Sequence, residues 1–200
     1  MKIALDFDGV LSHTMKRWVA VFNLHYKDKY EIDELTIREI DRWAFFEKFN
    51  MPVDEAFEIF DKCWTNWEKL EPLEQDIYQK TKMLSNLAHG ELDIVTTVSE
   101  DKIPFITRWL LRHDIVYRKV IHSKEKHKLD YDVYIDDSPK NVTEMYDAGK
   151  VVLMYNQPWN RHIDDIKMKE AFSGRLLMRV YNLYHAIDVI RSLERAGRFD

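Results

Sequence analysis

Apolar residues alternate between two kinds of spacing along most of this chain. Short consecutive apolar runs, which are typical of buried strands, occur at 2–5, 93–98, 119–122, 132–135, 151–155 and 176–180. Apolar spacings of three and four, together with helix start and stop signals, predict helices at 14–27, 74–89, 103–113, 139–148 and 183–193. Strands that alternate with helices predict an α/β fold, with a parallel sheet covered by helices on both faces.

The segment 31–72 departs from this alternation. Charged residues there are mixed with large aromatic residues at spacings of three and four, and glycine is absent. That pattern favours a small all-helical insert after the first strand. Thr36 and Glu39 have the spacing of a capping box, and Pro52 separates two of the expected helices.

Composition narrows the class of protein. The chain has 200 residues, 46% of them hydrophobic, which is enough for a sizeable core. Its formal net charge of −5 argues against a nucleic-acid polymer as partner. Cys63 is the single cysteine, so no internal disulfide can form. No apolar run approaches the ~20 residues of a membrane-spanning helix, and the N-terminus reads as a strand rather than a leader. We expect a cytoplasmic protein that does not bind membranes.

Polar side chains stand where three of the predicted strands end. Ligands of such sheets bind beyond the carboxyl ends of the strands. The residues at these ends are Asp6, Asp8, Thr96, Thr97, Asp136 and Asp137. Three lysines come shortly before the last of these strand ends: Lys124, Lys126 and Lys128. One edge of the sheet therefore gathers four carboxylates, two hydroxyls and at least one cation.

Four carboxylates at one edge would repel each other unless a cation lay between them. A set of oxygen ligands favours Mg²⁺. A phosphate group could then lie against Asp6, accept hydrogen bonds from Thr96 and Thr97, and be neutralised by a lysine. Gly9 would allow a sharp turn that brings a backbone amide to the phosphate.

Each feature taken alone has a simpler interpretation. Asp-x-Asp-Gly can be a turn or part of a calcium loop, although Val10, Leu11 and His13 supply no further oxygen ligands for calcium. The acidic pair can cap a helix, the threonines can be ordinary strand residues, and the lysines can be solvated surface. Their order at successive strand ends favours a shared phosphate site.

These residues resemble the four motifs of the haloacid dehalogenase superfamily. The motifs are Asp6-Phe7-Asp8-Gly9-Val10-Leu11, Thr96-Thr97, Lys126 and Asp136-Asp137. Within that superfamily the chain is similar to the 5′(3′)-deoxyribonucleotidases. The further features are Leu70-Glu71-Pro72, the ten residues between Lys126 and Asp136, and Asn160-Arg161-His162. The resemblance implies a Rossmann-like three-layer core formed by 1–13 and 73–200, and a helical cap at 14–72.

The resemblance also implies a role for each site residue. Asp6 would be the nucleophile that forms an aspartyl-phosphate, and Asp8 the general acid and base. Mg²⁺ would be held by Asp6, by the backbone carbonyl of Asp8 and by Asp137, with Asp136 either a direct ligand or a partner of the ligands. Thr96, Thr97 and Lys126 would bind phosphate; Lys124 and Lys128 are the alternatives to Lys126.

The substrate depends on the cap. The resemblance implies a small phosphate ester, a (deoxy)nucleoside monophosphate that is cleaved to a nucleoside. The alternatives are a sugar phosphate or other small metabolite, and a catalytically silent phosphate-binding protein. A homodimer is left open. The cap residues that could stack on a nucleobase are Phe45, Phe46, Trp64 and Trp67, although aromatic residues at helical spacing more often form the core of their own bundle.

Overall fold

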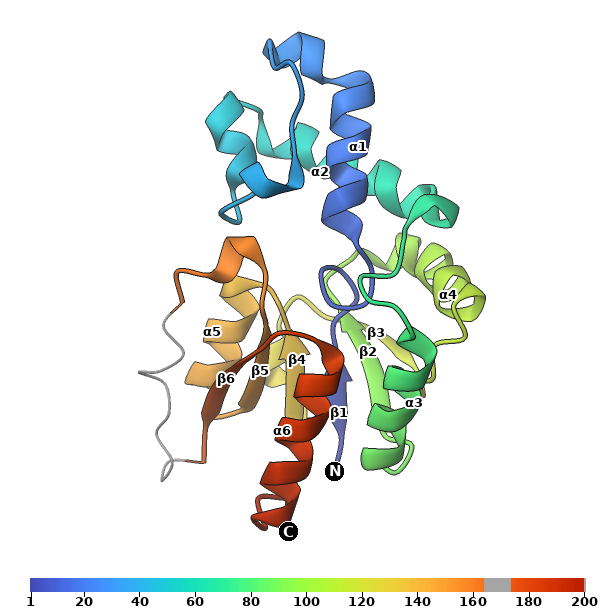
Figure 1. Cartoon of the computed structure of the whole chain (residues 1–200), viewed down its shortest axis with the longest axis vertical. Helices are drawn as coiled ribbons and strands as arrows, with labels where there is room; N and C mark the ends of the chain where they lie inside the picture. The colour runs from blue at the N-terminus through green and yellow to red at the C-terminus, as the bar shows by residue number, and fades with distance from the viewer. Residues whose placement is uncertain (164–173, 200) are drawn as a thin grey trace.

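The computed structural model describes residues 1–163 and 174–199. The expected core segment 73–200 therefore lies partly outside the described residues. Six parallel strands form one sheet in the order β3-β2-β1-β4-β5-β6. The strands are β1 (Ile3–Leu5), β2 (Leu92–Thr96), β3 (Val120–His122), β4 (Val133–Asp136), β5 (Val151–Tyr155) and β6 (Leu176–Val180). The predicted parallel α/β fold is confirmed, with β1 at the centre of the sheet (Figure 1).

Helices cover both faces of this sheet. The core helices are α3 (Ile77–Leu87), α4 (Ile103–Arg112), α5 (Pro139–Asp147) and α6 (Leu183–Arg195). Successive strand residues point to opposite faces. Leu5 packs in the same apolar cluster as α3, α4 and α6, whereas Ala4 packs in the cluster that contains Val142 and Met145 of α5. The chain therefore folds as three layers. No helix of the described residues is long and apolar enough to cross a membrane.

Segment 14–72 lies beyond the carboxyl ends of the strands (Figure 1). It contains two α-helices, α1 (Thr14–His25) and α2 (Val53–Thr65). Its other helical pieces are 3₁₀ turns: Lys27–Tyr30, Ile37–Glu39, Phe45–Phe49 and Trp67–Lys69. The predicted Thr36–Glu39 capping box forms, with the Thr36 amide donating to the Glu39 carboxylate at 2.7 Å. The turn that it begins ends at once, because Ile40 leaves helical backbone geometry.

Aromatic packing holds this segment together. The ring of Trp18 is fully buried, stacks on Phe22 at 5.4 Å between ring centroids and meets the edge of Phe45 at 4.8 Å. Its Nε1 donates to the carbonyl of Ala56 at 3.0 Å, which joins α1 to α2. These aromatic residues pack on one another within the same apolar cluster as β1, α3, α4 and α6.

The start of α3 differs from the sequence prediction. We expected a helix from residue 74, but α3 begins at Ile77 because Asp76 adopts left-handed backbone geometry (φ 55°). Glu74 lies outside the helix and its carboxylate joins three elements. It accepts from Tyr155 Oη at 2.6 Å and from the Leu183 amide at 2.8 Å, and it pairs with Lys80 at 2.8 Å.

The buried position of Trp18 predicts a large effect on stability. We expect Trp18→Ala to lower the free energy of unfolding by about 3–5 kcal/mol, because it removes a large buried side chain. Urea denaturation followed by circular dichroism measures this change. Leu24→Ala on the same helix is the control, since Leu24 is 72% exposed. Similar losses in the two variants would contradict a stabilising role of Trp18 in the packing of segment 14–72.

Candidate active site

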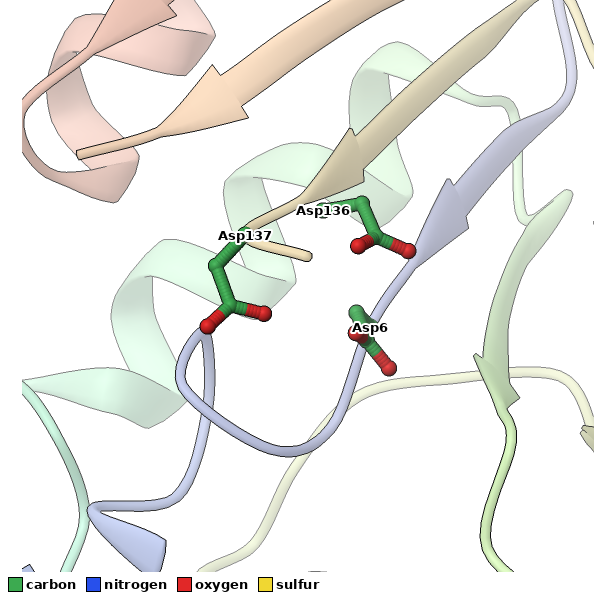
Figure 2. A group of neighbouring side chains, drawn as sticks. All are labelled: Asp6, Asp136 and Asp137. Atoms are coloured by element: carbon green, nitrogen blue, oxygen red, sulfur yellow. The ribbon is translucent and has the colours of Figure 1, made fainter. Parts of the chain in front are cut away.

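Parallel pairing of β1 with β4 brings three carboxylates together. Leu5 pairs with Ile135, and the Asp6 amide donates to the Ile135 carbonyl at 2.9 Å. Both strands end at this point, so Asp6 meets Asp136 and Asp137. Oxygen atoms of the three side chains lie within 4.8 Å of one another, and all three residues are buried (Figure 2). Sequence reasoning predicted this gathering from the strand ends.

Among the described residues, one lysine lies inside this cluster. Lys126 Nζ is 2.8 Å from Asp6 Oδ1 and 2.7 Å from Asp136 Oδ2, and its side chain is 2% exposed. Lys124 is exposed, and Lys128 is exposed and pairs with Glu125 at 2.6 Å. Of the three lysines that the sequence offered, the structure therefore brings Lys126 into the acidic cluster.

The two members of the acidic pair have different surroundings. Asp136 is engaged through both oxygens: Oδ2 by Lys126, and Oδ1 by the Ser138 amide at 2.9 Å. The Asn141 side chain lies 3.3 Å from Oδ2. Asp137 extends toward the loop after β1 (Figure 2). The structure gives one hydrogen bond from a described residue to its carboxylate, from Trp159 Nε1 to Oδ2 at 2.9 Å.

Gly9 makes the close approach of that loop to Asp137 possible. Its φ is +72°, a backbone conformation that residues other than glycine rarely adopt. A Cβ atom at this position would lie 2.1 Å from Asp137 Oδ2. The first motif and the acidic pair are therefore in direct van der Waals contact, which no larger residue would permit.

Sequence reasoning missed a supporting loop after β5. Gln157 Nε2 donates to the Gly9 carbonyl at 2.7 Å. Asn160 Nδ2 donates to the Asp137 carbonyl at 2.9 Å and to the Tyr155 carbonyl at 2.8 Å. Trp159 reaches the Asp137 carboxylate, as described above. The signal available in the sequence was the polar and aromatic run 156–160 directly after a buried strand. Of the three supporting residues, the family resemblance included Asn160 but not Gln157 or Trp159.

Asp8 points to the helical segment. Its Oδ1 accepts a hydrogen bond from Thr14 Oγ1, at the start of α1, and one from Trp64 Nε1, near the end of α2, at 3.0 Å. Thr14 Oγ1 also lies 2.6 Å from Ser12 Oγ. Two helices thus each contribute a donor to one oxygen of this carboxyl group, and sequence reasoning foresaw neither contact.

Of the other residues considered from the sequence, some are buried and the rest are at least partly exposed. Thr96 is buried at the end of β2, and its hydroxyl oxygen accepts from the Val98 amide at 3.2 Å, which leaves the hydroxyl hydrogen free to donate. Thr97, beside it, is exposed. Phe45 is 1% exposed against Trp18, so it belongs to the core of the helical segment. Phe46 and Trp67 remain partly exposed.

Burial sets the electrostatics of the cluster. It raises the pKa of Asp6 to about 8, with a further contribution from Asp136. Burial also raises the pKa of Asp137 well above its ordinary value, and that of Asp8, despite the hydrogen bonds that Asp8 accepts. For Lys126, burial lowers the pKa, but attraction to Asp136 and Asp6 outweighs it and the net shift is upward. Lys126 therefore stays charged beside Asp6 and Asp136.

The residues present fit a divalent cation. The donors are carboxylate oxygens that lie close enough to share one ion, and burial disfavours their charges unless a cation balances them. Oxygen donors of this type suit Mg²⁺. The unequal engagement of the pair leaves Asp137 more accessible to an ion than Asp136, whose two oxygens already have partners.

Comparison with known proteins agrees with this geometry. A family model described as "5′ nucleotidase, deoxy (Pyrimidine), cytosolic type C protein" matches residues 1–180. The chain belongs to this nucleotidase family. The match covers the central strand, the helical segment and every residue of the site described above.

Individual relatives agree with this assignment. A protein of Chlorobaculum tepidum, described as a candidate 5′(3′)-deoxyribonucleotidase, is 36% identical over 59 residues, which are 30% of this chain and 29% of that protein. A nucleotidase of Clostridium acetobutylicum is 22% identical over 167 residues, covering 80% of this chain and 83% of its own length.

Solved structures show the same fold. A haloacid dehalogenase-like hydrolase of Streptococcus pneumoniae has a TM-score of 0.64 at 14% identity, over 94% of this chain and 97% of that one. A hydrolase of the same superfamily from Deinococcus radiodurans, solved with phosphate and sodium, has a TM-score of 0.58 at 13% identity, over 98% and 96%. These likenesses confirm the expected fold.

The contact of Gly9 with Asp137 gives a test of the metal site. We expect Gly9→Ala to weaken Mg²⁺ binding about 10-fold or more, because the added methyl group displaces the Asp137 carboxylate. Isothermal titration calorimetry measures the affinity. Gly149→Ala is the matched control: its φ is +82°, but no atom lies within 4 Å of the added Cβ. Equal weakening in both variants would show that backbone strain, and not the clash, is responsible.

The raised pKa of Asp6 predicts that the metal-free protein is less stable at higher pH. A carboxyl pKa that is raised by folding stabilises the folded state while the group is protonated. This contribution is fully present below about pH 4 and is lost progressively as the pH rises from there to about 8. For this group the loss is limited to about 1.4 kcal/mol per pH unit. Urea unfolding in EDTA at several pH values measures it. Asp6→Asn lacks this titration, so parallel curves for the two proteins would contradict the assignment.

Proposed function

We propose that this protein is a Mg²⁺-dependent phosphomonoesterase that converts (deoxy)nucleoside monophosphates to nucleosides and phosphate. The observation that carries the proposal is the contact of Lys126 with Asp6 inside a buried cluster of three carboxylates, with Asp8 two residues further along the chain. This arrangement supplies a nucleophile, a cation for the phosphate, ligands for a metal ion and a proton donor within one site.

Asp6 is the nucleophile in this proposal. Its carboxylate attacks phosphorus, the bond from phosphorus to the ester oxygen breaks, and Asp8 gives its proton to the departing oxygen. Water then attacks the aspartyl-phosphate, Asp8 takes a proton from that water, and phosphate leaves Asp6. The raised pKa of Asp8 supports its role as an acid, since a carboxyl group of ordinary pKa would hold no proton near neutral pH.

Asp6, the backbone carbonyl of Asp8 and Asp137 would hold the Mg²⁺ ion, and Asp136 would orient Lys126 beside them. When bound, the ion neutralises charge on the phosphate and on the nucleophile. Thr96, Thr97 and Lys126 would bind the phosphate oxygens. The hydroxyl hydrogen of Thr96, which is available to donate, and the position of Lys126 support this assignment. Thr97 is exposed, so it would donate to the phosphate from the solvent side of the site.

We also propose that the chain divides into a core of 1–13 and 73–200 and a cap of 14–72. The two connections between them lie side by side: the His13 amide donates to the Glu71 carbonyl at 2.8 Å, and the Leu73 amide donates to the Leu11 carbonyl at 2.8 Å. Paired connections at one place are what a hinged cap requires. A cap over the strand ends would exclude water and contact the nucleoside.

The family description and the nucleotidase relatives support a nucleotide as substrate. The word "cytosolic" in the family description supports a cytoplasmic location. A substrate panel tests this assignment. With Mg²⁺, we expect phosphate release from nucleoside monophosphates with a kcat/KM at least about 10-fold above that for sugar phosphates. Generic activity without such a preference would favour a small-metabolite phosphatase, and no release from any ester would favour a silent phosphate-binding protein.

Asp6→Asn tests the chemical mechanism separately. We expect turnover to fall by about 10³-fold or more, because an amide is not a nucleophile here. The circular dichroism spectrum should be unchanged, since the amide can still meet its neighbours. Lys124→Met is the control, because Lys124 is exposed and lies two residues from the buried Lys126. Full activity of Asp6→Asn would refute the aspartyl-phosphate route.

A further inference from the structure

Trp64 connects the helical segment to the proposed acid. The residue lies in the last turn of α2, is 8% exposed, and donates from Nε1 to Asp8 Oδ1 at 3.0 Å. Its ring is held in place by Phe60, at 5.8 Å between ring centroids with nearly parallel planes. The indole N–H is therefore held in a fixed position against Asp8, whereas the sequence suggested this ring either as a surface for stacking on a nucleobase or as part of the core of the helical segment.

The two hydrogen bonds at Asp8 determine which of its oxygens can carry a proton. Trp64 Nε1 and Thr14 Oγ1 both lie against Oδ1. An indole N–H can only donate, so Oδ1 must accept from it. An oxygen that accepts two hydrogen bonds is stabilised as the unprotonated oxygen of the carboxyl group, so these contacts favour Oδ2 as the site of the proton. The pair of contacts also fixes the rotation of the carboxyl group, because the partners come from different helices, α1 and α2.

We propose that Trp64 is a positioning residue that holds Asp8 Oδ1, so that Oδ2 presents its proton to the departing ester oxygen. This inference rests on the proposed phosphatase function. In the first step the ester P–O bond breaks, its electron pair goes to the departing oxygen, and that oxygen takes the proton from Oδ2. In the second step Oδ2 takes a proton from the attacking water. The proton on Trp64 Nε1 is not transferred.

A positioning role predicts a dependence on the leaving group. Nucleosides are poor leaving groups that need a proton as the P–O bond breaks, whereas p-nitrophenolate leaves without one. Well-placed acid catalysis contributes about 10²–10⁴-fold to a rate. We expect Trp64→Phe, which retains a ring against Phe60 but lacks the N–H, to lower kcat for a nucleoside monophosphate by about 10–100-fold. With p-nitrophenyl phosphate, kcat should fall by no more than about 3-fold.

Two further variants sharpen this comparison. Trp43→Phe makes the same substitution at a half-exposed position of the helical segment and should leave both rates unchanged. In an Asp8→Asn background the acid is absent, so Trp64→Phe should add little further loss for the nucleotide. Equal losses for the two esters, or a change confined to the KM for the nucleotide, would overturn the proposal and assign Trp64 to fold stability or to base binding.

A spectroscopic measurement separates this inference from the proposed function. In ¹⁵N-tryptophan-labelled protein, the indole signal of Trp64 is the one that Trp64→Phe removes. We expect Asp8→Ala to shift this signal, whereas the indole signal of Trp43 stays in place. An unmoved signal would refute the contact with Asp8. A shifted signal in a protein that cleaves no ester would retain the contact and refute the phosphatase function on which its role depends.

Discussion

The site depends on the pairing of Lys126 with Asp6 and Asp136 at the ends of two adjacent strands. Burying carboxylates without a cation would cost several kcal/mol each. Among the described residues, Lys126 alone pairs with these carboxylates, at 2.8 Å from Asp6 and 2.7 Å from Asp136, so it offsets only part of that cost and leaves negative charge unbalanced. That remaining charge is what a divalent ion would balance. Burial, with a further contribution from Asp136, raises the pKa of Asp6, and a bound cation would relieve the same cost.

The rest of the core keeps this cluster in place through uncharged contacts. Gly9 allows the first loop to touch Asp137, and Gln157 holds the carbonyl of Gly9 from the loop after β5. Asn160 bonds to the backbone of Asp137 in the same way. None of these groups adds charge to the site. They fix the positions of the carboxylates while leaving its electrostatic balance to Lys126 and to the ion.

Much of the core could be predicted from the sequence because its signals are local. Apolar runs gave the strands, and acids at strand ends gave Asp6 and Asp137, since parallel strands carry their ends to one edge. The predicted start of α3 was wrong because Asp76 adopts left-handed backbone geometry, which apolar spacing does not indicate. The contact of Trp64 with Asp8 was missed because it joins positions 56 residues apart. Aromatic spacing alone does not distinguish a ring that packs from one that donates.

Two indole groups hold two carboxyl groups of the site, Trp159 at Asp137 and Trp64 at Asp8. A lysine or arginine in either place would neutralise the carboxylate and pull its pKa down. An indole N–H has no charge, cannot bind a metal ion and donates in one fixed direction. Under the proposed function, Trp159 would therefore orient Asp137 without competing for the ion, and Trp64 would orient Asp8 without adding a charge that draws off its proton. Among the described residues, these two carboxyl groups are thus held by uncharged donors, which suits a site where one would bind a cation and the other would carry a proton.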